Sequence, residues 1–220
     1  MQNEHVIYAC ATDIAGKVRG KGFPAAEFEK RLKRGIGWAP TNVQITCFDA
    51  IADSPFGSLG DMVLIPDAAT RVSVRSEESG LSEDFVFGDI RQTDGTPWDC
   101  CTRSILKAAL ARLENAAGLT LVSAFEHEFQ FKGKAMPMGT AYTMTGFRQR
   151  RAFAEKLIAA MRTAGLDADT IMKEYGADQY EVTMGPQRGV TSADHSAILR
   201  ELIQAVAAEA GEEVTFTPMR

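Results

Sequence analysis

The segment 119–131 constrains the fold more than any other part of the chain, because its side chains alternate between two kinds of surface. Successive side chains of a β-strand point to opposite faces. One face of such a strand is largely apolar and carries Leu119, Leu121, Ser123, Phe125, His127, Phe129 and Phe131. The other face turns from apolar to acidic and carries Thr120, Val122, Ala124, Glu126, Glu128 and Gln130. We therefore expect one long strand that packs its apolar face on helices and projects two glutamates from the other.

The glutamate pair has two interpretations. Glu126 and Glu128 would repel each other at this spacing unless water or a cation screens them. A cation site is one physical reason for the pair, and an ordinary solvated face is the alternative. His127 falls on the apolar face, so we predict a core histidine with satisfied polar atoms rather than a metal ligand.

A second acidic pair, Glu174 and Glu181, flanks a turn signal. Gly176, Ala177 and Asp178 can form a tight turn between two strands. If these strands lie beside 119–131 in one sheet, the four carboxylates could converge. Such a site would suit divalent cations that prefer oxygen ligands, meaning Mg²⁺ or Mn²⁺.

The first 90 residues or so are typical of short strands around one helix. Pro24 opens the helix and Gly35 ends it. Strand-like segments are expected at 6–11 and from 17 onward, joined as a hairpin by a turn around Asp13 to Gly16, and at 43–48, 62–65, 71–74 and 85–90. This order suits a small β-grasp sheet. A break at Asp94, Gly95 and Pro97 predicts two domains, a β-grasp domain over 1–95 and a second domain over 96–220.

The remainder alternates helices with strands. We expect helices over 104–115, closed by Gly118, over 147–164, closed by Gly165, and from Ser192 as N-cap to about residue 210. The first carries Ile105, Leu106, Ala109, Leu110 and Leu113 on one face. The fold class predicted for the whole chain is α+β, with an α/β-like second domain.

Composition excludes several functions. The chain has 220 residues, 45% of them hydrophobic, and a formal net charge of −5. Basic residues do not cluster, so no nucleic-acid partner is expected. The 4 cysteines lack zinc-site spacing, which favours free thiols in a reducing compartment. No secretory signal and no run of roughly 18 apolar residues is present. We therefore expect no membrane contact and a cytoplasmic protein.

Several segments, in order, resemble the glutamine synthetase family along nearly the whole chain. They are Gly60 to Asp67 with Thr70, Arg103 before Ile105 and Leu106, Phe125 to Phe129, Glu174 to Glu181, Ala193 with Asp194, and Val214 to Pro218. The third resembles the family's Glu-x-Glu-Phe strand, and the fourth resembles its paired-glutamate motif.

The resemblance implies an ATP-dependent ligase. Family members convert the γ-carboxylate of glutamate into an acyl phosphate, which ammonia or an amine then attacks. By the family pattern, Glu128, Glu174 and Glu181 would hold one Mg²⁺ or Mn²⁺ ion, and Glu126 would help to hold a second near ATP. The active sites would lie between subunits of a homo-oligomeric ring.

Two positions depart from the family pattern. Asp49 lies closest to the family's catalytic Asp, which helps to bind and deprotonate ammonium. The usual Asp-Gly-Ser-Ser is replaced here by the residues from Asp49 to Ser54. This departure slightly favours an amine other than ammonia as acceptor, and an ordinary loop residue is the alternative for Asp49. Asp178 stands where the family usually has Gly.

The chain ends at Arg220, before the family's metal-ligand His, its phosphate-binding arginines and a further metal-ligand Glu. We therefore expect a fragment without ligase activity by itself. The alternative is a truncated or non-catalytic homologue that acts as a subunit-interaction or metal-binding module.

Overall fold

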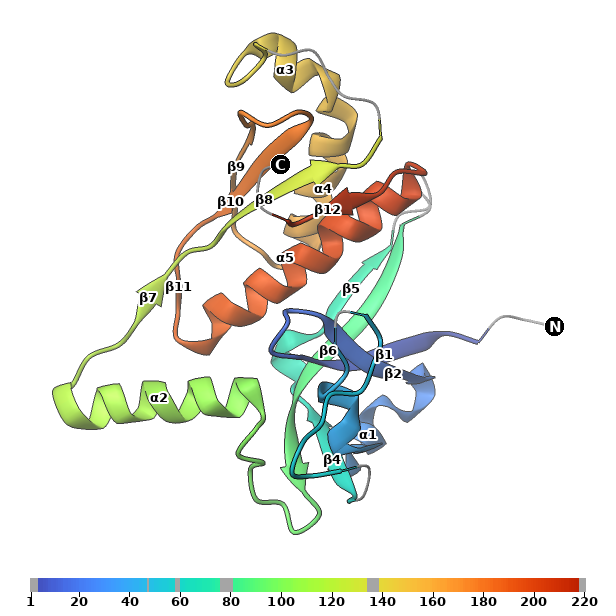
Figure 1. Cartoon of the computed structure of the whole chain (residues 1–220), viewed down its shortest axis with the longest axis vertical. Helices are drawn as coiled ribbons and strands as arrows, with labels where there is room; N and C mark the ends of the chain where they lie inside the picture. The colour runs from blue at the N-terminus through green and yellow to red at the C-terminus, as the bar shows by residue number, and fades with distance from the viewer. Residues whose placement is uncertain (1–3, 47, 58–59, 76–80, 134–138, 218–220) are drawn as a thin grey trace. The chain divides into compact units, whose positions relative to one another are not determined.

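A computed structural model describes residues 4–46, 48–57, 60–75, 81–133 and 139–217 (Figure 1). Their contacts define two compact units, one formed by 1–72 with 84–120, the other by 73–83 with 121–220. The domain limits given above, 1–95 and 96–220, stay a prediction. Among the described residues, no helix is long and apolar enough to cross a membrane.

The first unit is a β-grasp sheet with strand order β2-β1-β6-β4-β3, in which β1 and β6 run parallel and the other neighbours antiparallel. Its elements are β1 Val6–Thr12, β2 Val18–Pro24, η1 Ala25–Glu27, α1 Phe28–Arg34, β3 Ile36–Trp38, η2 Pro40–Val43, β4 Met62–Pro66, η3 Ala68–Thr70 and α2 Thr102–Ala117. Strand β5, Val72–Arg75, and the long strand β6, Ser82–Gln92, pair with each other and extend into the second unit.

Alternation along the strands builds the core of this unit. Ile7, Leu64 and Val86, one from each of three neighbouring strands, are fully buried, and Trp38 and Trp98 join the same cluster. Each buried side chain of this size contributes about 1.5–3 kcal/mol through removal of apolar surface from water. The β-grasp prediction is confirmed.

One predicted strand in this unit is wrong. In place of the strand expected over 43–48, Val43 ends the 3₁₀ turn η2 and Ile45 makes only an isolated bridge with Ile51, while Cys47 lies outside the described residues. The edge strand is β3 instead, directly after Gly35. Gly35 has φ +68°, and a Cβ there would overlap the side chain of Val63, so this helix stop also permits close packing of β3 on β4.

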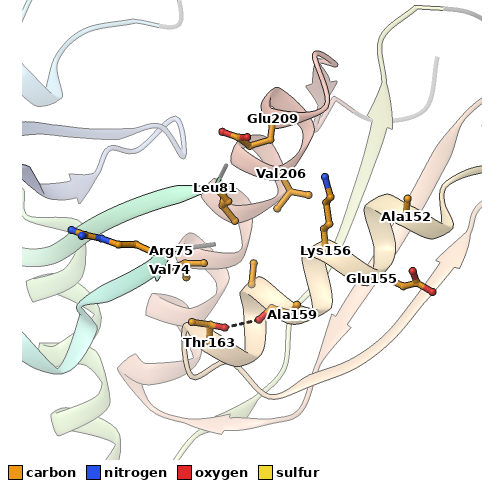
Figure 2. A pocket seen from close by; sticks show the side chains of 11 residues that line it. Val74, Arg75, Leu81, Ala152, Glu155, Lys156, Ala159, Thr163, Val206 and Glu209 are labelled. Carbon is orange, nitrogen blue, oxygen red and sulfur yellow. Dashed lines mark hydrogen bonds between the residues drawn. The ribbon is translucent and has the colours of Figure 1, made fainter. Parts of the chain in front are cut away.

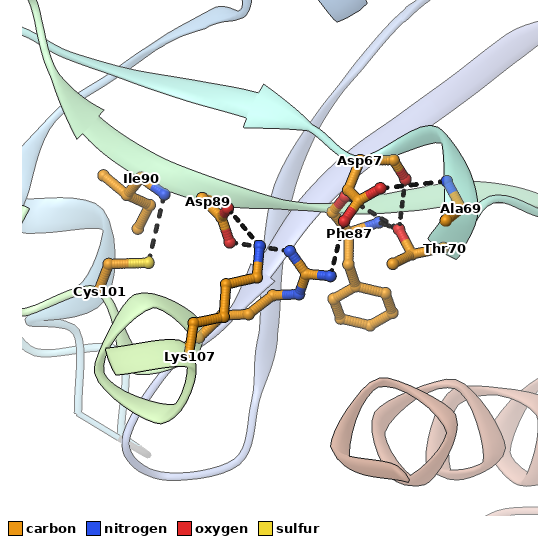
Figure 3. A network of polar contacts seen from close by, with 9 residues as sticks. Asp67, Ala69, Thr70, Phe87, Asp89, Ile90, Cys101 and Lys107 are labelled. Carbon is orange, nitrogen blue, oxygen red and sulfur yellow. Dashed lines mark hydrogen bonds and ion pairs between the residues drawn. The ribbon is translucent and has the colours of Figure 1, made fainter. Parts of the chain in front are cut away.

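A polar network fastens the start of α2 to the sheet (Figure 3). The Arg103 guanidinium donates to Asp67 and to Asp89, both at 2.8 Å, and Lys107 donates to Asp89 at 2.6 Å. Burial opposes the charge on Asp89, but the hydrogen bonds from Lys107 and Arg103 hold the pKa of Asp89 below its usual value. Helix α2 has no buried residue, and Ile105 on its apolar face is 52% exposed.

Arg103→Ala is expected to lower the free energy of unfolding by about 2 kcal/mol, because it leaves the largely buried Asp89 with one partner and Asp67 with none of its charge partners. Urea denaturation followed by circular dichroism measures the change. Arg112→Ala, on the same helix but exposed, is the matched control and should change stability by less than about 0.5 kcal/mol. Equal losses in the two variants would contradict the structural role of the network.

The second unit is an antiparallel sheet of order β12-β8-β10-β9, with a two-stranded sheet formed by β11 and β7. Its elements are β7 Val122–Ser123, β8 Glu126–Phe131, α3 Met144–Gln149, α4 Arg151–Thr163, β9 Ala168–Lys173, β10 Gln179–Met184, β11 Gln187–Arg188, α5 Val190–Glu209 and β12 Val214–Thr215. Phe129 and Phe131 of β8 contact Phe153 of α4, with ring centroids 5.7 and 5.0 Å apart. One face of the sheet is therefore covered by a helix.

The structure divides two of the predicted elements of this unit. The long strand over 119–131 is two strands, because β7 pairs with β11 whereas β8 pairs with β10 and β12. Only the second half of its apolar face is buried, and Leu119 is 57% exposed. The helix over 147–164 is interrupted at Arg150.

The last helix begins at Val190 rather than at Ser192. The Ser192 hydroxyl is buried inside the first turn and donates to the carbonyl of Ser123 at 2.8 Å. This hydroxyl therefore ties α5 to β7 instead of capping the helix.

Candidate functional site

Strand register brings three of the four predicted glutamates to one face of the second sheet. Glu128 of β8 lies directly opposite Glu181 of β10, and Glu126 lies opposite Thr183. Residues directly opposite in an antiparallel pair project to the same side and are near neighbours. Glu126 and Glu128 are exposed and Glu181 is half-buried, so this face is open to solvent at the glutamates.

The fourth glutamate, Glu174, follows β9 and is buried. Its amide donates to the carbonyl of Gln179 at 2.8 Å, which closes the turn between β9 and β10. The amide of Tyr175 donates to Glu174 Oε2 at 3.2 Å. The Gln179 side chain joins the turn to β8, because its Oε1 accepts from the amide of Gly176 at 2.8 Å and its Nε2 donates to Glu128 Oε2 at 2.7 Å.

The pKa of Glu181 is raised by its surroundings. Burial raises the pKa of Glu181, and repulsion from Glu126, Glu174 and Glu128 raises it further. Both effects disfavour the charged carboxylate, and a cation among the four groups would relieve both.

The donor set fits a hard divalent cation. All four groups are carboxylates, which are ligands that Mg²⁺ and Mn²⁺ accept. Within the described residues, no three His, Cys, Asp or Glu side chains already stand in a ligating arrangement. Two of the four carboxylates accept hydrogen bonds from neighbouring side chains, because Gln179 donates to Glu128 and Tyr142 donates to Glu174. The pairing of β8 with β10 places the backbones of Glu128 and Glu181 opposite each other, and the distance between their carboxylates then depends on side-chain rotation.

Tyr142 is a site neighbour that the sequence did not reveal. Its hydroxyl donates to Glu174 Oε1 at 2.5 Å, and this bond raises the pKa of Tyr142 to about 12. Its ring contacts Tyr175, with centroids 5.4 Å apart, and its φ is +56°. Nothing in the spacing between Tyr142 and Glu174 signals the contact, since only the fold places the segment before α3 beside the turn.

His127 lies on the helix-covered face of the sheet, opposite to the glutamates. Its Nε2 is 3.0 Å from both the carbonyl and the hydroxyl oxygen of Ser196 on α5. Burial lowers the pKa of His127. This confirms the prediction of a core histidine with satisfied polar atoms.

Asp49 lies in the first unit, in an exposed turn of the long loop before β4. Its amide donates to the carbonyl of Thr46 at 3.2 Å, and its φ is +60°. An isolated bridge between Ile45 and Ile51 closes this turn. Asp49 belongs to the first unit and the four glutamates to the second, and its catalytic role stays a prediction.

Residues of the second unit that the structure describes line at least two cavities. The larger, about 600 Å³, lies against α4 and α5, and Figure 2 shows Lys156 and Val206 among its walls. None of the four glutamates lines it. The other, about 500 Å³, is bounded by Tyr142, Phe147 of α3 and Met172 of β9. Met172 is the cross-strand partner of Glu181, so this cavity borders the candidate site.

The fold and the site together define an α+β protein with a β-grasp unit and a carboxylate-bearing antiparallel sheet. Residues 1–98 match the glutamine synthetase N-terminal domain, and residues 99–220 match the glutamine synthetase catalytic domain. The chain belongs to the glutamine synthetase family.

Individual relatives agree with this membership. A γ-glutamylpolyamine synthetase from Streptomyces coelicolor is 30% identical, and the aligned region covers 99% of this chain and 48% of the relative. A glutamate–methylamine ligase from Methyloversatilis universalis is 26% identical, with 96% and 48% covered. A crystal structure described as a novel glutamine synthase homolog superimposes with a TM-score of 0.90 at 36% identity, covering 99% of this chain and 52% of that one. The chain thus spans about half the length of the relatives it matches.

Proposed function

We propose that these residues belong to an ATP-dependent ligase that joins ammonia or an amine to the γ-carboxylate of glutamate through an acyl phosphate. The observation that supports the proposal is that Glu126, Glu128 and Glu181 share one face of the β8–β10 pair, with Glu174 at the adjoining turn, in a chain of the glutamine synthetase family. A carboxylate is a poor electrophile and its charge repels phosphate, so such a ligase needs a site that gathers cations.

We assign to the glutamates the roles that the family resemblance implies. Glu128, Glu174 and Glu181 would hold one Mg²⁺ or Mn²⁺ ion near the acceptor carboxylate, and Glu126 would help to hold the second near ATP. When bound, these ions would neutralise the acceptor carboxylate and the phosphates. Gln179 orients Glu128 and Tyr142 orients Glu174 through the hydrogen bonds described above, and such outer partners fix the direction of ligating side chains.

The acceptor is proposed to be ammonia or an amine. Relatives named for methylamine and for polyamines support the amine. The protein is proposed to assemble into a homo-oligomeric ring with active sites between subunits, where Asp49 of one subunit would approach the glutamates of its neighbour. Size-exclusion chromatography with light scattering tests the assembly, and a strictly monomeric protein would contradict it.

The test of function is phosphate release from ATP by the natural gene product that contains these residues, with glutamate, Mg²⁺ and either ammonia, methylamine or putrescine. We expect release that requires both glutamate and an amine, together with a γ-glutamyl product detected by mass spectrometry. Release without an amide product, or none with any acceptor, would contradict the proposal. Residues 1–220 alone are expected to give no turnover in the same assay, and measurable turnover would contradict that expectation.

A further inference from the structure

Arg150 interrupts the helical segment between α3 and α4, and its guanidinium reaches three other parts of the second unit. It donates to Asp178 through Nε at 3.2 Å and through Nη2 at 2.5 Å. Its Nη1 donates to both carboxylate oxygens of Glu212 at 2.6 Å, and the group lies 3.8 Å from the centroid of the Phe131 ring. Burial opposes the charge on Arg150, but the hydrogen bonds to Asp178 and Glu212 raise its pKa. The Arg150 side chain is 19% exposed.

Asp178 adopts a backbone conformation that usually favours glycine. Its φ is +49°, in the left-handed region, where a side chain meets steric strain that Asp tolerates better than most residues. Its side chain is 4% exposed and accepts both hydrogen bonds of the Arg150 fork. A two-point Arg–carboxylate pair fixes orientation as well as distance, because the guanidinium is planar and rigid.

The turn that contains Asp178 also carries the candidate site. The carbonyl of Asp178 accepts from the amide of Phe131 at 3.2 Å, and the next residue, Gln179, donates to Glu128. On the other side of the turn, Gln179 accepts hydrogen bonds from the amide of Glu174 through its carbonyl and from the amide of Gly176 through its side chain. A shift of Asp178 would therefore move the contacts that orient two of the four glutamates.

We propose that Arg150 and Asp178 form a positioning pair that locks the β9–β10 turn, with Glu212 as the second anchor of Arg150. The pair sets where Glu174 and Glu181 stand relative to Glu128 without touching a metal or a substrate. Its effect on the turn is independent of the proposed ligase function, whereas its effect on cation affinity rests on that function.

The first experiment compares Arg150→Met with Arg151→Met. Arg151 is the matched control, because it is the next residue and its ion pair with Glu155 is exposed on both sides. Hydrogen exchange is measured at the amides of Glu174, Gly176 and Gln179, with Val182 as the core reference. We expect exchange at least tenfold faster at these three amides in Arg150→Met and unchanged in Arg151→Met. Calorimetric titration with Mn²⁺ alone should show about tenfold weaker binding for Arg150→Met only, the lower end of the range for outer-shell partners.

A second set of variants keeps the test decisive if Arg150→Met does not fold. Asp178→Asn keeps the shape of the side chain but removes its charge, and it should repeat the exchange effect. Asp178→Gly removes the need for the pair, because glycine adopts the left-handed region without strain. Adding Arg150→Met to Asp178→Gly should therefore accelerate exchange less than threefold further, which shows that the two residues are coupled.

The outcomes separate this proposal from the proposed function. Unchanged exchange at the turn in Arg150→Met and Asp178→Asn would overturn the positioning pair, whatever Mn²⁺ does. Faster exchange with unchanged Mn²⁺ affinity would also overturn it, since the pair would then be structural only. If the unaltered protein binds no Mn²⁺, the metal roles fail, and selective acceleration of exchange at the turn would still support the pair.

Discussion

Replacing Glu128 and Glu181 together by alanine is expected to abolish saturable Mn²⁺ binding, with affinity reduced at least about 100-fold. The two residues face each other across β8 and β10, so they are the centre of the candidate site. Carboxylate number governs the affinity of oxygen-ligand sites for divalent cations, and this variant removes two of four. Isothermal titration calorimetry with Mn²⁺ measures the change.

The same variant should not unfold the protein. Like charges directly opposite in a sheet are destabilising by roughly 0.2–1 kcal/mol, and their removal offsets part of the lost side-chain packing. The thermal midpoint is thus expected to stay within a few degrees of its original value. Glu155→Ala/Glu213→Ala, at two exposed glutamates of the same unit, is the matched control and should retain Mn²⁺ binding. A folded double variant at 128 and 181 that still binds Mn²⁺ normally would refute the metal roles.

Phe129→Ala is expected to cost about 3–5 kcal/mol of unfolding free energy, the largest effect on stability that we predict. Phe129 is 1% exposed and its ring contacts those of Phe131, Phe153, Tyr180 and Phe216. Removing it opens a cavity at the centre of the aromatic cluster that supports β8. Urea denaturation followed by circular dichroism measures the loss.

The consequence for the site is specific, because Phe129 lies between Glu128 and Gln130 on β8. A cavity on the helix-covered face loosens the strand that presents glutamates on the other face. Phe48→Ala, at a phenylalanine that is 88% exposed, is the control and should change stability by less than about 0.5 kcal/mol. A loss below about 1 kcal/mol for Phe129→Ala would mean that the cluster is not the core of the unit.

Local signals were enough for much of the fold. The hairpin of β1 and β2, the end of α1 at Gly35 and the end of α2 at Gly118 were all predicted, because turn and cap residues act within a few positions of themselves. The turn between β9 and β10 was predicted for the same reason. The sequence-based predictions failed where contacts with residues far along the chain determine the structure. The helix predicted over 147–164 is interrupted at Arg150, whose guanidinium pairs with Asp178 and Glu212.

The candidate site was likewise predicted only in part from the sequence. By itself, the sequence determined that Glu126 and Glu128 share a face of a strand, that Glu174 and Glu181 flank a turn, and that the chain resembles the glutamine synthetase family. Only the tertiary structure decided that Glu128 stands opposite Glu181, that Tyr142 contacts Glu174, and that Arg150 holds Asp178. The physical reason is that alternation along a strand is a property of consecutive residues, whereas register and side-chain pairing depend on how segments far apart in the chain pack against each other.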